Sequence, residues 1–501
     1  MSNYNSHDDL VLIRPNGRKI MYHGVKAVTT AVDPPYWLTV MGGYLRDANI
    51  DVAHNDAEAA GQTPEETAGL VRSLSPVLVG VFTIGSNLTA STWTMPGANI
   101  LCKTIKNICP FLPVFLWGNH PSALPERTIR EEAIDYVIIG KGFDAIKELY
   151  TCIRKNGKGR NKIQGVQYLE NNALAGDGHV SIIDNLDTIP PDGWDLFPSE
   201  QRNYRNHLHF AFEDLPKRCQ YGAVLSSLGC PFYCTYCAIR TFSSNTRGMR
   251  YKTVESAIAQ ADYWVKERNV FYLRIMDECF TINRKFVYEF CQLLKERSYN
   301  LSIWINARID TVDEEFLSVM YDAGIRWLGY GIESRSKRIR SIVNKEQYDF
   351  EKTRENVELT KKSGLFICEN VMSGFPGEKL EDMEVALALL RELNVEYPNM
   401  YCTMAYPGSR LYDDTVKTHP DWLPGTWAGY AQLIYETKPL NTEYLTSEQI
   451  LAFRDRAFNA FFEDTPRYFD MIKARFGQLA VNEINNMLKG RIPRKILGDS
   501  L

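Results

Sequence analysis

The sequence predicts an α/β protein whose first part is a doubly wound parallel sheet and whose last part is helical. Within the first 150 residues, short apolar runs of strand length alternate with segments of helical spacing. Such alternation indicates parallel strands with crossover helices on both faces of the sheet. Beyond about residue 440, apolar residues recur at helical spacing instead. A chain of 501 residues has room for two or three domains.

The N-terminal unit, residues 1–150, is expected to alternate strands and helices. Thr63 and Glu66 fit a capping box at the start of one helix, with Pro64 at its first position. Strands are expected at residues 10–14, 50–54, 77–83, 114–118 and 136–139, and helices at 37–46, from 63 onward, and at 95–108. A sheet of this kind binds ligands at the carboxyl ends of its strands.

Residues 151–214 are expected to form a linker that contains a small hairpin. Its arms would be residues 166–170 and 179–183, before a Pro-rich connector. The C-terminal region, residues 441–501, begins with a capping box at Thr446 to Gln449. The apolar positions that follow, Ile450, Phe453, Ala457 and Phe461, have helical spacing and are expected to pack against the preceding domain.

Three cysteines in one short run, Cys230, Cys234 and Cys237, have the spacing C-x3-C-x2-C. Three thiolates on one loop can bind three irons of a cubane iron–sulfur cluster and leave the fourth iron open. A zinc site is the alternative, and it would need Cys219 as a further ligand. Disulfides fit poorly with an odd count of 11 cysteines and no secretory signal. Six other cysteines lie in mostly apolar surroundings and are interpreted as small core residues: Cys102, Cys109, Cys152, Cys291, Cys368 and Cys402.

Charge and hydropathy exclude several classes of protein. A formal net charge of −4, with only two short basic runs, argues against nucleic acid as a partner. The N-terminus is polar and acidic, unlike a signal peptide, and no apolar stretch is long enough to span a bilayer. We therefore expect a cytoplasmic protein without a transmembrane segment.

The run Cys230–Cys237 resembles the signature of the radical S-adenosylmethionine (SAM) superfamily, and further landmarks of that family follow it. They are Arg250–Lys252, Ile275–Thr281, Trp304–Arg308, Gly329–Ser334, Ser373–Glu378 and Tyr406–Ser409. The resemblance implies a partial (β/α)6 TIM-like barrel over residues 215–440, with a 4Fe–4S cluster on the three cysteines and SAM on the open iron. The residues that it assigns to cofactor binding are Tyr236 near the adenine, Glu333 and Ser334 near SAM, and Asp277, Glu278 and Arg308 at strand ends.

The N-terminal unit resembles the Rossmann-like cobalamin-binding domain of cobalamin-type radical SAM enzymes. Three loops after predicted strands carry this resemblance: Ser86–Leu88, Gly118–Ser122 and Gly140–Gly142. Asn119 and Lys141 stand where that group usually has glycine and glutamate. The residues implied in cobalamin binding are Ser86, Leu88, Gly118, His120, Gly140 and Gly142.

One motif of other cobalamin proteins is absent. The Asp-x-His-x-x-Gly sequence, which supplies a histidine to cobalt in the methionine synthase type, is missing from the first strand–helix loop. His54 follows Asp51 at the wrong spacing, and His23 is more simply a surface residue of the long first loop. The resemblance therefore implies a cobalt without a histidine below it.

Taken together, the resemblance implies a radical SAM enzyme that, with cobalamin, methylates an unactivated carbon of a small-molecule or sugar precursor. It also implies an electron donor such as flavodoxin or ferredoxin as a partner. The alternatives are a non-methylating rearrangement, cyclisation or oxidation, a barrel with a cobalamin-free relic domain, and a non-catalytic corrinoid or metal sensor. No catalytic residue is assigned, and Cys279 and Tyr330 are interpreted as ordinary barrel-lining residues.

Overall fold

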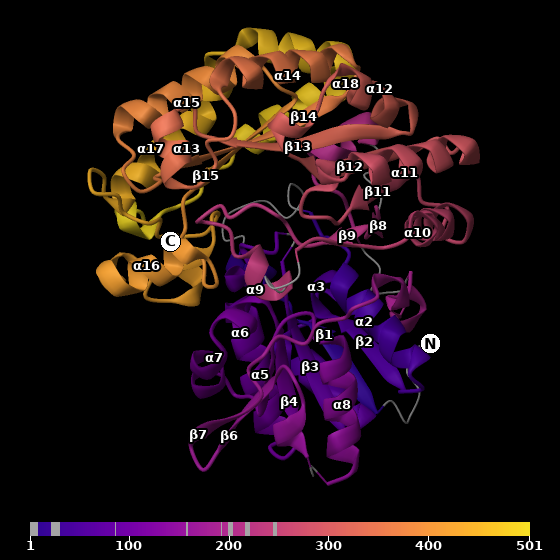
Figure 1. Cartoon of the computed structure of the whole chain (residues 1–501). Coiled ribbons are helices and arrows are strands. Elements are labelled where there is room, and N and C mark those ends of the chain that lie inside the picture. Colours follow the sequence, from indigo (N-terminus) through magenta and orange to yellow (C-terminus); the bar gives the residue numbers. More distant parts are fainter. Residues whose placement is uncertain are drawn as a thin grey trace.

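Two α/β units are stacked on each other, and the helical C-terminal segment packs on the upper one (Figure 1). The computed structural model describes residues 9–21, 31–85, 87–156, 159–191, 193–198, 204–215, 221–243 and 248–500. The lower unit, in indigo and purple, contains the N-terminal strands, and the upper unit, in pink and orange, contains the strands beyond residue 221.

The lower unit is built on a sheet with the strand order β2-β1-β3-β4-β5-β6-β7, in which β1 to β5 are parallel. The chain reverses its winding direction between β1 and β3, as in a doubly wound sheet, and a ligand crevice is expected at that point. The parallel strands are β1 (Leu10–Arg14), β2 (Val52–Asp56), β3 (Leu78–Thr83), β4 (Val114–Gly118) and β5 (Tyr136–Ile138). The helices are α1 (Arg18–Met21), α2 (Tyr36–Asp47), α3 (Ala57–Ala60), α4 (Pro64–Leu74), α5 (Met95–Ile108), α6 (Asn119–Ala123), α7 (Pro125–Glu131) and α8 (Phe143–Arg154).

The predicted strands and helices of this unit are confirmed, and α5 and β4 have the expected bounds. The capping box before α4 is also present. The Thr63 Oγ1 accepts a hydrogen bond from the Glu66 backbone N–H (3.2 Å), and the Glu66 Oε2 accepts one from the Thr63 N–H (2.7 Å). These two bonds satisfy backbone donors that a helix start would otherwise leave unpaired.

The hairpin in the linker belongs to the lower sheet, and its second arm is not the predicted one. β6 (Val166–Glu170) pairs antiparallel with β5, and β7 (Ala173–Gly176) pairs with β6. The prediction of a second arm at residues 179–183 was wrong. The turn falls at Asn171 and Asn172, which both adopt positive φ (49° and 63°). Asparagine tolerates this conformation, so the chain reverses within two residues and the return strand starts earlier.

The upper unit contains a six-stranded parallel sheet with the order β15-β14-β13-β12-β11-β8, and this confirms the predicted partial barrel. Its strands are β8 (Gly222–Val224), β11 (Tyr272–Ile275), β12 (Ser302–Ala307), β13 (Ile325–Glu333), β14 (Phe366–Ser373) and β15 (Tyr397–Cys402). The helices are α9 (Ile239–Ser243), α10 (Val254–Lys266), α11 (Arg284–Arg297), α12 (Glu314–Asp322), α13 (Lys337–Ile342), α14 (Phe350–Lys362), α15 (Leu380–Leu393) and α16 (Arg410–Thr418). A short ladder of β9 (Ser227–Leu228) with β10 (Arg250–Tyr251) stands beside it.

Two helices close the chain, α17 (Ser447–Glu463) and α18 (Pro466–Leu488). The predicted capping box of α17 is confirmed, and the four predicted apolar positions of this helix are buried. α18 is interrupted at Gly477, and the preceding Phe476 stacks on Trp327 of the barrel with a centroid distance of 5.9 Å. The C-terminal aromatic residues therefore pack as core against the barrel, as expected.

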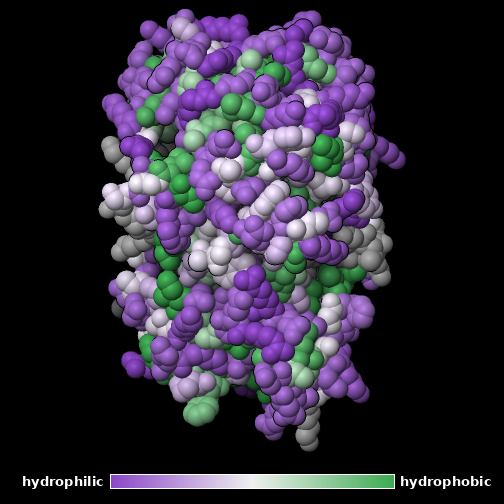
Figure 2. Space-filling view, turned by 90° about the vertical axis from the view of Figure 1, so that its left-hand side faces the viewer, coloured by the Kyte–Doolittle hydropathy of each residue, from purple (hydrophilic) through white to green (hydrophobic). Residues whose placement is uncertain are grey.

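Single 3-10 turns connect several of these elements. They are Ser91–Thr94, Arg160–Lys162, Leu186–Thr188, Trp194–Leu196, His209–Asp214, Phe280–Ile282, Ile309–Thr311, Pro420–Trp422, Trp427–Tyr430 and Lys495–Leu497. The described part of the chain has no helix that is both long and apolar enough to cross a membrane. The face in Figure 2 is mostly hydrophilic, with hydrophobic residues scattered over it.

Candidate functional site

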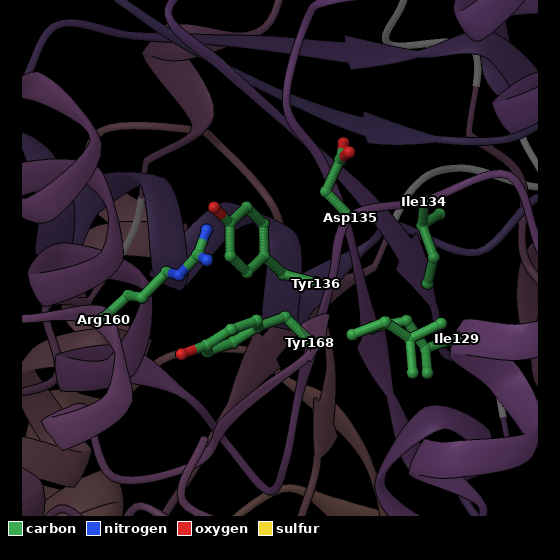
Figure 3. Close-up of a pocket in the computed structure, with 7 residues that line it drawn as sticks. Ile129, Ile134, Asp135, Tyr136, Arg160 and Tyr168 are labelled. Carbon is green, nitrogen blue, oxygen red and sulfur yellow. The ribbon is translucent and has the colours of Figure 1, made fainter. Parts of the chain in front are cut away.

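A cavity of about 1120 Å³ opens between the two units. Its wall combines the loop after β3, the cysteine loop, the inner face of the barrel, the middle of α17 and the end of α18. A second hollow of about 300 Å³ lies on the lower unit, where Arg160 lies over the ring of Tyr168 (4.3 Å) beside Tyr136 (Figure 3). None of the predicted site residues lines this smaller hollow, so the large cavity is the candidate site.

The three cysteines of the triplet all line the large cavity, and each is partly exposed. The loop that carries them starts at Gly229, whose N–H donates to the Glu278 Oε2 (3.0 Å). Asp277 fixes the strand before it: its carboxylate accepts bonds of 2.5–3.0 Å from the backbone N–H and the hydroxyl of both Ser226 and Ser227. Two predicted cofactor residues, Asp277 and Glu278, thus hold the cysteine loop in place.

The donor set of the loop fits a cubane cluster. Burial raises the pKa of Cys230 to about 12 and raises that of Cys237, and the neighbouring thiols add to both shifts. Thiolates held this close need positive charge between them. Among the described residues no three His, Cys, Asp or Glu side chains converge on one ion, whereas a cubane gives each thiolate its own iron. Cys219, the additional ligand of the alternative zinc site, lies outside the described residues.

The side of the cavity nearest β13 carries a buried ion pair. Glu333 has a positive φ of 65° at a register shift between β13 and β14, and this turns its side chain into the cavity. Its Oε1 accepts hydrogen bonds from the Tyr236 hydroxyl (3.0 Å) and from the Lys345 ammonium (2.9 Å). Burial disfavours the charge on Lys345, but the Glu333 carboxylate outweighs it, so the pKa of Lys345 is raised. Lys345 was not predicted, because it follows α13 in a segment without a motif.

Arg308 presents an unused donor to the same cavity. Its Nε and Nη2 bind the Asp310 carboxylate (2.9 and 2.8 Å), and its guanidinium lies 3.7 Å over the ring of Phe232 in the cysteine loop. The Nη1 is buried and has no hydrogen-bond partner among the described residues. Such a donor is costly unless a ligand accepts from it, so Arg308 is suited to an acidic ligand group in the cavity. Ser334, by contrast, is buried and does not line the cavity.

The predicted cobalamin residues that the structure describes follow the carboxyl ends of β3, β4 and β5. Leu88 lines the cavity, whereas Ser86 lies outside the described residues, as does His23. Gly118 ends β4 with a φ of 155°, and a Cβ there would lie 2.4 Å from the Thr83 carbonyl oxygen, so only glycine fits. Gly140 and Gly142 flank Lys141 after β5 and do not line the cavity.

Two buried side-chain nitrogens at this edge of the sheet have no hydrogen-bond partner among the described residues. The Nδ1 of His120 contacts the Thr92 hydroxyl (3.2 Å), while its Nε2 has no partner among the described residues. Burial lowers the pKa of His120 to about 3, so the imidazole is neutral. The Lys141 ammonium likewise has no hydrogen-bond partner in the described chain and lies over the rings of Trp37 (3.5 Å) and Phe242 (4.0 Å). Burial lowers its pKa to about 7.

A direct contact joins the two cofactor regions. The Thr89 hydroxyl, in the loop after β3, lies 3.6 Å from the Sγ of Cys237 and accepts a hydrogen bond from the Ala238 N–H (3.3 Å). A thiolate has no proton to donate, so the hydroxyl proton of Thr89 points to the sulfur once a metal is bound. Sequence reasoning missed Thr89, because its partner lies 148 residues away.

Replacing Thr89 with valine is therefore expected to lower the reduction potential of the cluster. The shift should be on the order of 20 to 60 mV, the one-electron equivalent of a hydrogen bond worth about 0.5–1.5 kcal/mol. Redox titration followed by electron paramagnetic resonance measures it. Thr104→Val, which removes an exposed hydroxyl bonded to its own helix, is the matched control and should leave the potential unchanged. An unshifted potential in Thr89→Val would exclude the hydrogen bond.

Comparison with known proteins agrees with both halves of the site. The family model of the radical SAM superfamily matches residues 224–390, and that of the B12 binding domain matches residues 22–150. Together the two matches cover more than half of the chain.

Individual relatives align across both domains. An uncharacterized methyltransferase of Pyrococcus horikoshii is 28% identical over 442 residues, which are 87% of this chain and 90% of the relative. The anaerobic magnesium-protoporphyrin IX monomethyl ester cyclase of Rubrivivax gelatinosus is 25% identical, over 81% of this chain and 69% of its own length.

A solved structure shares the fold. It is the radical SAM methyltransferase TsrM from Kitasatospora setae with tryptophan substrate and the SAM analogue aza-SAM bound, with a TM-score of 0.68 and 16% identity. The alignment covers 96% of this chain and 99% of that one. The chain thus belongs to the radical SAM superfamily, in the group that joins a cobalamin-binding domain to the radical SAM barrel, and its cofactors are a 4Fe–4S cluster, SAM and cobalamin.

Proposed function

We propose that this protein is a cobalamin-dependent radical SAM methyltransferase that transfers a methyl group to an unactivated carbon of a small molecule. The observation that carries the proposal is the single cavity bounded by both cofactor regions. Leu88 and Trp93 after β3 line it on one side, and Cys230 and Cys237 line it on the other. Its volume of about 1120 Å³ exceeds that of a pocket for one small ligand, so a substrate and a cofactor fit together.

Within this proposal the chain's own residues bind, orient and exclude water. The bound groups supply a carbon-centred radical and a methyl carrier. We assign Tyr236, Glu333 and Arg308 to SAM, and Leu88 with the loops around His120 and Lys141 to cobalamin. The far end of the barrel is closed by aromatic rings, including Trp304, which keep water out of the reaction space.

The relatives support methyl transfer and also name a second candidate reaction. The Pyrococcus horikoshii relative is named a methyltransferase, and TsrM is a methyltransferase solved with tryptophan as its substrate. The Rubrivivax gelatinosus relative is a cyclase, so ring formation without methyl transfer is the second candidate. An external one-electron donor, such as flavodoxin or ferredoxin, belongs to either reaction.

One experiment separates these reactions. The protein is reconstituted anaerobically with about four irons per chain and bound corrinoid, and is then incubated with methyl-labelled SAM, a reductant and fractionated cell extract. We expect the label in a small-molecule product, and no label transfer from a preparation without corrinoid. Cleavage of SAM with an unlabelled, ring-closed product would favour the cyclase. A protein that binds corrinoid but never cleaves SAM would contradict both.

A further inference from the structure

The inner face of the barrel presents a short arginine-and-amide surface to the cavity. It consists of Arg274 on β11, Asn306 on β12, Asn370 on β14 and Asn399 on β15. Alternation along β11 explains the position of the arginine: Leu273 and Ile275 are buried at 1% exposure, and Arg274 between them faces the opposite way. A partly buried cation inside a barrel is costly and calls for a polar or charged partner.

Among the described residues, Arg274 has a hydroxyl partner in Tyr221 but no carboxylate at ion-pair distance. Its Nε is buried without a hydrogen bond, and no described carboxylate lies within ion-pair distance of its guanidinium. Arg308, which follows β12 and also lines the cavity, is paired with Asp310 (2.8 Å). The Tyr221 hydroxyl shares a side-chain hydrogen bond with Arg274, and the Asp33 carboxylate interacts with the Arg274 charge from beyond ion-pair distance. That carboxylate, however, is already bound by Tyr221 (3.0 Å) and His207 (3.0 Å).

The three amides complement the arginine with acceptors. The Asn306 side chain donates to the Asp277 carbonyl oxygen (3.1 Å), and that of Asn399 donates to the Asn370 Oδ1 (3.1 Å). These bonds orient both amides, and no described residue donates to the Oδ1 of Asn306 or Asn399. A ligand in the cavity would therefore meet the guanidinium of Arg274 on β11 and free acceptor oxygens on β12 and β15.

We propose that Arg274 binds a carboxylate of the substrate, and that Asn306 and Asn399 accept hydrogen bonds from hydroxyl or amino groups near that carboxylate. The inference rests on the proposed function, because it places the substrate in the same cavity. A carboxylate matches a single planar guanidinium through two parallel hydrogen bonds. A phosphate dianion would call for a second cation. The strands place only Arg274 in the cavity, and its other cations, such as Lys345 and Arg454, come from other segments.

The test uses the reconstituted, SAM-loaded enzyme and matched pairs of probes. Each pair is an aromatic carboxylic acid and its primary amide, such as phenylacetate and phenylacetamide, with phenyl phosphate as a third arm. Binding is measured anaerobically by ligand-observed nuclear magnetic resonance. We expect acids to bind at least about tenfold more tightly than their amides, and Arg274→Gln to remove this preference. Arg274→Lys should retain part of it, and Arg72→Gln, on the exposed face of α4, should retain all of it.

Three results would overturn the assignment. They are equal affinity of acid and amide across the whole set, a preference that persists in Arg274→Gln, and tighter binding of phenyl phosphate than of every acid. Iron and corrinoid contents show whether each variant is folded. If Arg274→Gln does not fold, the preference for acids is compared between the parent protein and Arg274→Lys.

Methyl transfer gives a separate readout. A labelled product without an acidic group, formed equally well by Arg274→Gln, would refute the role of Arg274 and leave the proposed function standing. Acid binding through Arg274 without methyl transfer would refute the proposed function alone.

Discussion

Replacing Cys234 with alanine is expected to abolish both the iron–sulfur cluster and the reductive cleavage of SAM. Cys234 is the middle cysteine of the triplet. The other described cysteines of the cavity, Cys279 and Cys368, are buried and lie on the loop after β11 and on β14 instead of the cysteine loop. A cubane cluster with one open iron needs three protein thiolates, one on each of the other irons, and two thiolates do not hold it. Iron content should fall from about four per chain to near zero, and 5′-deoxyadenosine production should fall to background.

The fold of the Cys234→Ala variant is expected to survive, because backbone contacts hold the loop. The Thr235 N–H donates to the Val343 carbonyl oxygen (3.2 Å), and the Thr235 carbonyl oxygen accepts from the Leu411 N–H (2.8 Å). Circular dichroism should therefore match that of the parent protein. Cys109→Ala, at the end of α5 and outside the cavity, is the matched control and should keep cluster and cleavage. Cleavage that persists in Cys234→Ala would mean that the cysteine loop is not the cluster site.

The fold was predictable from the sequence where local signals agree with the tertiary structure. β4 and α5 were predicted at their observed bounds, because a buried parallel strand is a continuous apolar run and a surface helix repeats every three to four residues. The hairpin failed at its second arm. There the left-handed Asn171 and Asn172 set the turn, and asparagine alone does not signal a two-residue turn as strongly as Asn-Gly.

The candidate site was predictable as a set of motifs but not as a set of contacts. Cys230, Tyr236 and Glu333 were expected to meet, and the structure places all three on one cavity. The residues that complete it come from chain positions without a motif. Lys345 is recognisable only through its bond to Glu333, and Arg274 only through its place on β11, where its Nε has no hydrogen-bond partner among the described residues. Contacts of this kind depend on strand register and loop packing, which a single sequence does not specify.

Replacing Lys345 with methionine is expected to destabilise the upper unit and to weaken SAM binding. The pair with Glu333 is buried, with exposures of 7% and 9%, and its loss leaves a carboxylate that keeps only the Tyr236 hydroxyl as a donor. Breaking one partner of a buried pair costs about 3–5 kcal/mol, because the remaining charge stays desolvated. Thermal unfolding and equilibrium binding of SAM measure the two effects. Lys352→Met, which breaks an exposed pair with Glu355 (3.0 Å), is the control and should cost less than about 1 kcal/mol.

The double variant Glu333→Gln/Lys345→Met separates folding from cofactor binding. It removes both charges, so most of the lost stability should return. SAM affinity should stay low, because the carboxylate that we assign to the cofactor is gone and an amide replaces a charged acceptor. If SAM affinity recovered together with stability, the pair would serve only to hold β13 against its neighbours. If neither recovered, the contact of Glu333 with Tyr236 would be the interaction that the fold requires, since the glutamine keeps only a neutral acceptor for that hydroxyl.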